Sequence, residues 1–133
     1  MTLITNYNRA PLFLSDVKSR NVTIVNPEAG EETIVRGTVL GRLPNGNYQV
    51  LKSAAVDGSQ YPKAILMYDI TLGASATGTV AVAIAGDVKQ DALVFNGSDT
   101  LATAVSTERL DDRLVRQGIY PTEVNDFTDY DNQ

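Results

Sequence analysis

The chain has 133 residues, of which 43% are hydrophobic and 20% are charged, a composition typical of a single globular domain. It contains no cysteine and no histidine, which excludes disulfides, thiolate metal sites and catalysis by either side chain. The net charge of −5 and the scattered positions of its 11 lysines and arginines argue against nucleic-acid binding, which requires clustered basic residues.

The first 20 residues mix aromatic, polar and apolar side chains without a regular period. Pro11 disfavours a helix at Ala10, because the residue before a proline avoids the helical conformation. We interpret residues 1–20 as an extended N-terminal arm, followed by a β-rich domain over residues 21–120.

The first half of this domain has the pattern of strands separated by turns. Val22 and Ile24 alternate with polar residues and predict a strand, and a second apolar run covers residues 33–43. Asn45-Gly46 tolerates the positive φ angles of a tight hairpin, and Asp57-Gly58 predicts another turn.

Two later apolar segments predict further strands. Residues 64–68 are apolar on both faces, as expected of an interior strand. In residues 79–85, valine and isoleucine occupy one face and alanine the other. We expect the larger side chains in the core, and the alanine face either against another subunit or against a tight loop of the same chain.

One helix is predicted near the C-terminus. Ser106 or Thr107 could cap its start, and Leu110, Leu114 and Val115 form its apolar stripe. Gly118 stands where a left-handed residue would end it. Residues 121–133 contain four acidic residues and no basic residue, and we interpret them as an acidic, flexible tail.

The motifs that resemble catalytic or metal sites are incomplete. Residues 71–75 resemble an aspartic protease loop without its aspartate, and Asp87 and Asp91 are interpreted as turn residues because calcium needs more oxygen ligands. The sequence therefore predicts a protein that is not an enzyme and has no cofactor, metal or small-molecule substrate. No apolar run approaches the roughly 18 residues that cross a bilayer, so we expect no membrane segment.

Several sequence phrases follow one another in a characteristic order. They are residues 37–41 (Gly-Thr-Val-Leu-Gly), Asn45-Gly46, residues 57–60 (Asp-Gly-Ser-Gln), residues 64–66, residues 80–84, residues 86–88, Leu93, and a terminal helix ending at Gly118-Ile119. This order resembles the phage lambda-type head decoration proteins over roughly residues 33–120. The first 30 residues and the acidic tail depart from the lambda pattern.

The resemblance implies a capsid-stabilising protein on the outer surface of a phage head, made in the host cytoplasm. It implies a homotrimer at three-fold and quasi-three-fold sites, with the major capsid protein as partner. Three copies of the arm around one axis would act together through a high effective concentration. The expected capsid-binding residues are the apolar and aromatic side chains of the arm, Leu3, Ile4, Tyr7, Leu12, Phe13 and Leu14.

Two alternatives remain open from the sequence. Residues 12–14 could instead form a first strand that packs on the protein's own core. The protein could also be another virion component, such as a tail protein, or a β-sandwich module that binds glycans or a receptor. The fold expected is mostly β, a small β-barrel or β-tulip-like domain with one C-terminal helix and an extended N-terminal arm.

Overall fold

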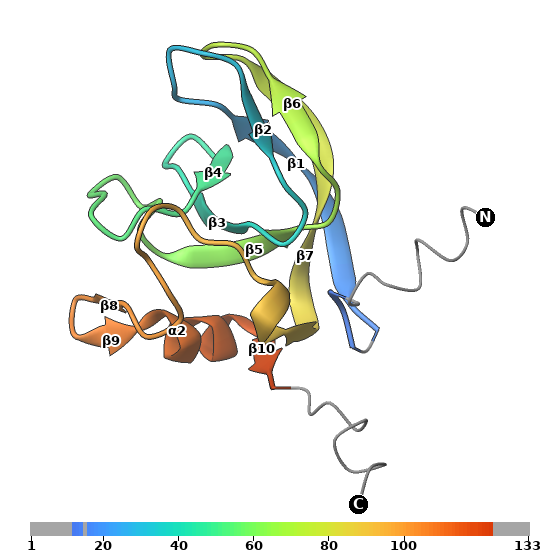
Figure 1. The fold of residues 1–133 in the computed structure, drawn as a ribbon, viewed down its shortest axis with the longest axis vertical. Coiled ribbons are helices and arrows are strands. Elements are labelled where there is room, and N and C mark those ends of the chain that lie inside the picture. The colour runs from blue at the N-terminus through green and yellow to red at the C-terminus, as the bar shows by residue number, and fades with distance from the viewer. Residues whose placement is uncertain (1–11, 15, 124–133) are drawn as a thin grey trace, which may run out of the picture.

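The computed structural model describes residues 12–14 and 16–123, and strands dominate this part of the chain (Figure 1). No helix in these residues is long and apolar enough to span a membrane. The elements are β1 (Lys18–Val25), β2 (Glu32–Ile34), β3 (Val39–Arg42), β4 (Tyr48–Val50), β5 (Pro62–Leu66), β6 (Ile70–Leu72), β7 (Thr77–Lys89), the 3-10 turn η1 (Gln90–Ala92), β8 (Ala104–Val105), β9 (Glu108–Arg109), α2 (Leu110–Gln117) and β10 (Ile119–Thr122).

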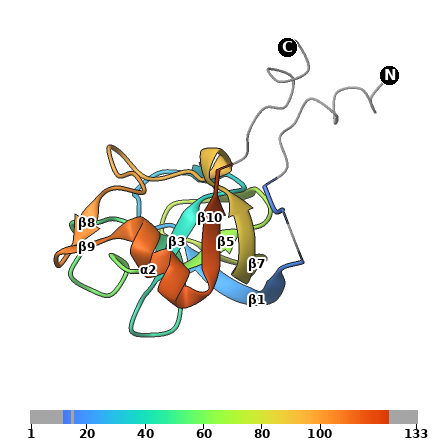
Figure 2. The ribbon, with the colours of Figure 1, turned by 90° about the horizontal axis from the view of Figure 1, so that it is seen from below.

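Five of these strands form a closed barrel in the order β1-β4-β3-β5-β7, and β7 pairs back with β1. The β1–β7 pairing is antiparallel, whereas β1 and β4 pair in parallel. Beyond the barrel, the end of β7 pairs in parallel with β10, beside α2 (Figure 2). The prediction of a small β-barrel with one C-terminal helix is confirmed, and the β-sandwich alternative does not match this closed sheet.

Two hydrophobic clusters lie on the two sides of the barrel sheet. Strands β3, β5 and β7 contribute to both clusters, because successive side chains of a strand point to opposite faces. One cluster fills the barrel and comprises Val22, Ile24, Ile34, Leu40, Tyr48, Ala64, Leu66, Leu72 and Val82. The other lies under α2 and β10 and comprises Leu12, Val39, Leu51, Ile65, Ala83, Val88, Val105, Leu110, Leu114 and Ile119.

The uneven faces of β7 match this two-sided packing. Val82 belongs to the barrel interior, and Ala83 belongs to the cluster under α2. At its centre, the alanine face therefore packs into the chain's own core, in the cluster that includes residues of α2 and β10.

The predicted turns around the first hairpin are confirmed. Gly46 has a φ of 92°, and the Leu43 N–H donates a hydrogen bond of 2.7 Å to the Asn47 carbonyl. Gly58 has a φ of 104°. The apolar run 33–43 is not one strand, however: β2 and β3 are separated by a turn at Gly37, where φ is 95°.

The start of the helix and the position of Asp87 differ from the predictions. Ser106 and Thr107, with φ angles of 50° and 70°, form the turn between β8 and β9 and do not cap the helix. The helix begins at Leu110 and ends, as predicted, at a left-handed Gly118 whose N–H bonds the last turn. Asp87 lies inside β7, opposite Tyr120, and is not a turn residue.

Strands extend beyond both predicted boundaries of the β-rich domain. Strand β1 begins at Lys18, inside the segment interpreted as an arm, and residues 12–14 pair with β7. At the other end, β10 includes Pro121 and Thr122, which lie inside the predicted tail. The remaining arm and tail predictions concern residues 1–11, 15 and 124–133, which lie outside the described residues.

Candidate functional site

The residues expected to contact a partner fall into three groups. Leu3, Ile4 and Tyr7 lie outside the described residues. Leu12 is only 2% exposed and packs in the cluster under α2, so its side chain belongs to the domain's own core. Phe13 is half-buried, and Leu14 is 37% exposed.

Backbone hydrogen bonds explain why Leu12 is buried. The Lys89 N–H donates to the Leu12 carbonyl at 2.8 Å, and the Leu14 N–H donates to the Asp87 carbonyl at 3.0 Å. Between them, Phe13 forms an antiparallel bridge with Val88. Residues 12–14 thus continue the pairing of β1 with β7 and turn Leu12 inward, as the alternative reading of this segment proposed.

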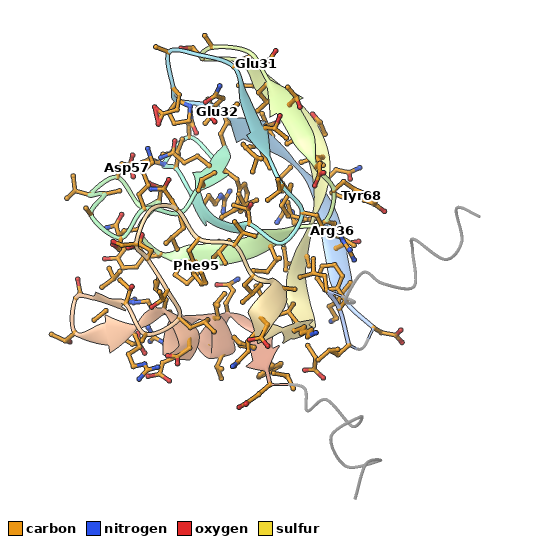
Figure 3. All side chains as sticks on the ribbon, in the orientation of Figure 1. Glu31, Glu32, Arg36, Asp57, Tyr68 and Phe95 are labelled. Atoms are coloured by element: carbon orange, nitrogen blue, oxygen red, sulfur yellow. The ribbon has the colours of Figure 1, made fainter. Side chains whose placement is uncertain are left out.

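Exposed aromatic and charged groups lie around residues 12–14. The Arg36 guanidinium lies 5.8 Å from the centre of the Phe13 ring, within the range of a cation–π contact. The Arg36 N–H donates to Asp69 Oδ1 at 2.6 Å, and the neighbouring Tyr68 is 60% exposed. Figure 3 shows Arg36 and Tyr68 on the same side of the barrel. We call Phe13, Leu14, Arg36, Tyr68 and Asp69 the arm-base surface.

The described chain enters and leaves at the same end of the barrel. Residues 12–14 pair with one side of the end of β7, and β10 pairs with the other side. Asp87 is the clearest example, because its carbonyl accepts from Leu14 while its register partner in β10 is Tyr120. Residues 1–11 and 124–133 therefore connect to the domain at a common end.

A second surface feature is a groove of about 240 Å³ between β2 and residues 94–96. We call it the β2 groove. Its apolar lining comes from Ile34, Val35, Val50, Val94 and Phe95. Charged residues, among them Glu28, Glu32 and Lys52, lie around this lining. No sequence pattern predicts this groove, because the lining residues come from three distant segments and share no motif.

Comparison with known proteins identifies the family. The family model described as bacteriophage lambda head decoration protein D matches residues 6–113, which is most of the chain. The match includes both the arm-base surface and the β2 groove, and no curated protein matches the chain. The chain therefore belongs to the bacteriophage lambda head decoration protein D family, whose members are structural capsid proteins associated with phage heads.

Proposed function

We propose that the protein binds the outer surface of a phage head as a homotrimer at three-fold and quasi-three-fold sites. The chain is made in the host cytoplasm and, once bound to the head, stabilises the lattice of the major capsid protein. The family match over residues 6–113 is the observation that carries this proposal. The small closed barrel supports it, because such a rigid body can hold several short contact segments in fixed positions.

The proposed capsid contacts centre on the arm and its base. Leu3, Ile4 and Tyr7 supply apolar and aromatic side chains in the arm, and Phe13 and Leu14 continue this series onto the domain surface. Tyr68 and Arg36 add an exposed aromatic ring and a cation beside them. Aromatic and arginine side chains are the groups that contribute most energy to protein interfaces. Leu12 fixes the base of the arm from inside the core.

Trimer formation would strengthen binding without stronger individual contacts. A closed three-fold oligomer presents three arm-base surfaces to one capsid site. Once one arm binds, the other two are held near their capsid sites at a high effective concentration, so three weak contacts give firm attachment. Light scattering of the purified protein tests this step. A protein that stays monomeric both in solution and on heads contradicts it.

Capsid binding is tested with heads assembled without the protein. We expect the full chain to sediment with these heads, and the chain lacking residues 2–11 to remain in the supernatant with an unchanged circular dichroism spectrum. Tyr68→Ala should weaken binding roughly tenfold, as for an aromatic interface anchor. Val56→Ala is the matched control, because Val56 is 93% exposed and lies outside the arm-base surface.

The result for the truncated chain decides where the contact lies. If the chain lacking residues 2–11 binds heads as tightly as the full chain, the arm is not a contact element. If no variant, including the full chain, binds heads, the decoration role itself is excluded.

A further inference from the structure

Strand β2 has one edge without a strand partner among the described residues. It pairs with β6 through Glu32↔Leu72, Thr33↔Thr71 and Ile34↔Ile70, and with no other described strand. In an antiparallel pair, backbone groups point alternately toward the partner and away from it. The edge of β2 that faces away from β6 therefore presents N–H and C=O groups. Figure 1 shows β6 along the other edge of this strand.

The β2 groove runs along this strand and has a fixed far wall. The Val94 N–H donates to the Gly37 carbonyl at 2.9 Å, and the Val94 carbonyl accepts from Val39 at 3.0 Å. These bonds hold residues 94–96 against the start of β3. Val35 and Val94 remain 39% and 38% exposed, so the groove offers apolar surface on both sides. Preformed walls lower the entropy cost of binding.

The volume of the groove indicates what can fill it. At about 240 Å³, it is smaller than the roughly 300 Å³ at which typical small-molecule pockets begin. A space of this size beside an open strand edge suits one or two side chains of an extended peptide.

The charges around the groove are mainly acidic. Glu28 and Glu32 line it, and Glu31 lies between them in sequence next to β2. Among the described lining residues, Lys52 is the only basic one, and its ammonium already lies 3.4 Å from the Glu28 carboxylate. In the described part of the chain, Glu31 and Glu32 form no salt bridge. Figure 3 places both at the end of the barrel where β2 begins.

We propose that the β2 groove binds an extended basic segment of a partner protein, which adds as a strand to the free edge of β2. Apolar side chains at alternate positions of the segment fill the space between Val35 and Val94. Lysine or arginine residues beside them pair with Glu31 and Glu32, because complementary charges direct association and fix the register. This contact lies outside the arm-base surface and extends the proposed function to a second binding site.

Two synthetic peptides test the proposal on the full chain. The first alternates threonine and valine and carries a lysine at each end, and the second has glutamate in place of both lysines. We expect the lysine peptide to shift the backbone amide NMR signals of Glu32, Thr33, Val94 and Phe95. We expect no such shifts with the glutamate peptide. Shifts confined to other residues, or no binding of the lysine peptide at millimolar concentration, overturn the proposal.

Charge reversal tests whether the lysine peptide depends on Glu31 and Glu32 or only on the net negative charge of the protein. The double variant Glu31→Lys, Glu32→Lys should bind the lysine peptide roughly tenfold more weakly at low salt. The control, Glu123→Lys, reverses one exposed carboxylate directly after β10 and should leave binding unchanged. An equal loss in the control shows that the effect is not specific to the groove and contradicts the proposal.

A third peptide distinguishes a partner protein from the chain itself. Residues 1–11 contain Leu3, Ile4, Tyr7 and Arg9 and no acidic residue, so they share part of the expected chemistry. If a peptide of residues 1–11 occupies the groove more tightly than the lysine peptide, the groove binds the chain's own N-terminal segment, and the partner assignment is wrong. The head-binding test of the chain lacking residues 2–11 is a separate measurement, and its outcome does not change what the peptide experiment shows about the groove.

Discussion

The Lys89 backbone N–H donates a hydrogen bond of 2.8 Å to the Leu12 carbonyl, which joins the first described residues to the end of β7. Deletion of residues 2–11 preserves this bond, whereas deletion of residues 2–14 removes it together with the buried Leu12 side chain. We expect the shorter deletion to keep the melting temperature and the longer one to lower it clearly. Thermal unfolding followed by circular dichroism measures both. Equal melting temperatures would mean that residues 12–14 contribute nothing to the fold.

Point substitutions in the same segment should separate core from surface. Leu12→Ala removes a side chain that is 2% exposed and should cost about 2–4 kcal/mol of unfolding free energy. Leu14→Ala, two residues along, changes a 37% exposed side chain and should cost less than about 0.5 kcal/mol. Urea denaturation measures both values. For binding to heads, we expect the larger direct effect from Leu14→Ala, which should weaken binding more than its small effect on stability explains.

Gly41 allows an unusually close backbone contact. A Cβ at this position would lie 2.2 Å from the Ser59 carbonyl oxygen and 2.6 Å from the Ser59 Cα, and neither atom can move without shifting the backbone. We expect Gly41→Ala to cost about 3 kcal/mol or more, because the strand and the turn must separate. Gly30→Ala is the control, since nothing lies within 4 Å of a Cβ there. Denaturation of both variants checks the difference, and a stable Gly41→Ala would show that this contact can relax.

Local sequence rules predicted those parts of the fold that depend on neighbouring residues. The hairpin at Asn45-Gly46 and the helix end at Gly118 each follow from the φ angle that the local backbone requires. Residues 64–66 are fully buried, as a run that is apolar on both faces indicates. Such features need no knowledge of the rest of the chain.

Features that depend on distant contacts could not be predicted in this way. The break between β2 and β3 occurs at Gly37, where a Cβ would lie 2.4 Å from the Ala92 carbonyl oxygen, far along the chain. Ser106 and Thr107 have the composition of a helix cap, but pairing of β8 with β9 places them in a hairpin turn. The β2 groove likewise exists only after folding brings its three segments together.

The side-chain amide of Asn26 forms hydrogen bonds with three backbone carbonyls at one end of the barrel. Its Nδ2 donates to the carbonyls of Gly30, Leu72 and Gly73 at 2.9, 3.2 and 3.0 Å, and the side chain is almost fully buried. A carboxylate only accepts hydrogen bonds when ionised, so Asn26→Asp would face three acceptors with a negative charge. We expect a loss of about 3 kcal/mol at neutral pH.

The loss in Asn26→Asp should depend on pH. Burial raises the pKa of the new carboxyl in the folded state, so the part of the penalty that comes from the charge is absent well below the unfolded value of about 3.9 and grows as the pH rises above it. The part that comes from the lost donor hydrogen of the amide remains at every pH. Denaturation at pH 4 and pH 7 measures this difference. The matched control is Asn45→Asp, because the exposed Asn45 acts as an acceptor for the Asn47 N–H, a role that aspartate keeps. An equal loss in both variants would contradict the role given to Nδ2.

Asp57 should give the protein a stabilising contribution that disappears in acid. Hydrogen bonds from the Ser59 hydroxyl at 2.6 Å and the Ser59 N–H at 3.0 Å lower the pKa of the Asp57 carboxyl below its ordinary value. Ser59 is fully buried and its hydroxyl also accepts from Gln49 Nε2 at 3.0 Å, so the turn is tied to β4. A lowered folded pKa means that the unfolded chain takes up the proton first as the pH falls.

The stability of wild type relative to Asp57→Asn should therefore be constant above about pH 5 and decline as the pH falls below the unfolded pKa of about 3.9. Denaturation of both proteins between pH 2 and pH 7 measures this difference directly, and the other carboxylates cancel because both proteins contain them. In a Ser59→Ala background the main cause of the lowered pKa is absent. The decline should then shrink, because the unfolded and folded chains bind the proton at more similar pH values. A decline of unchanged size would assign the effect to some group other than the Ser59 hydroxyl.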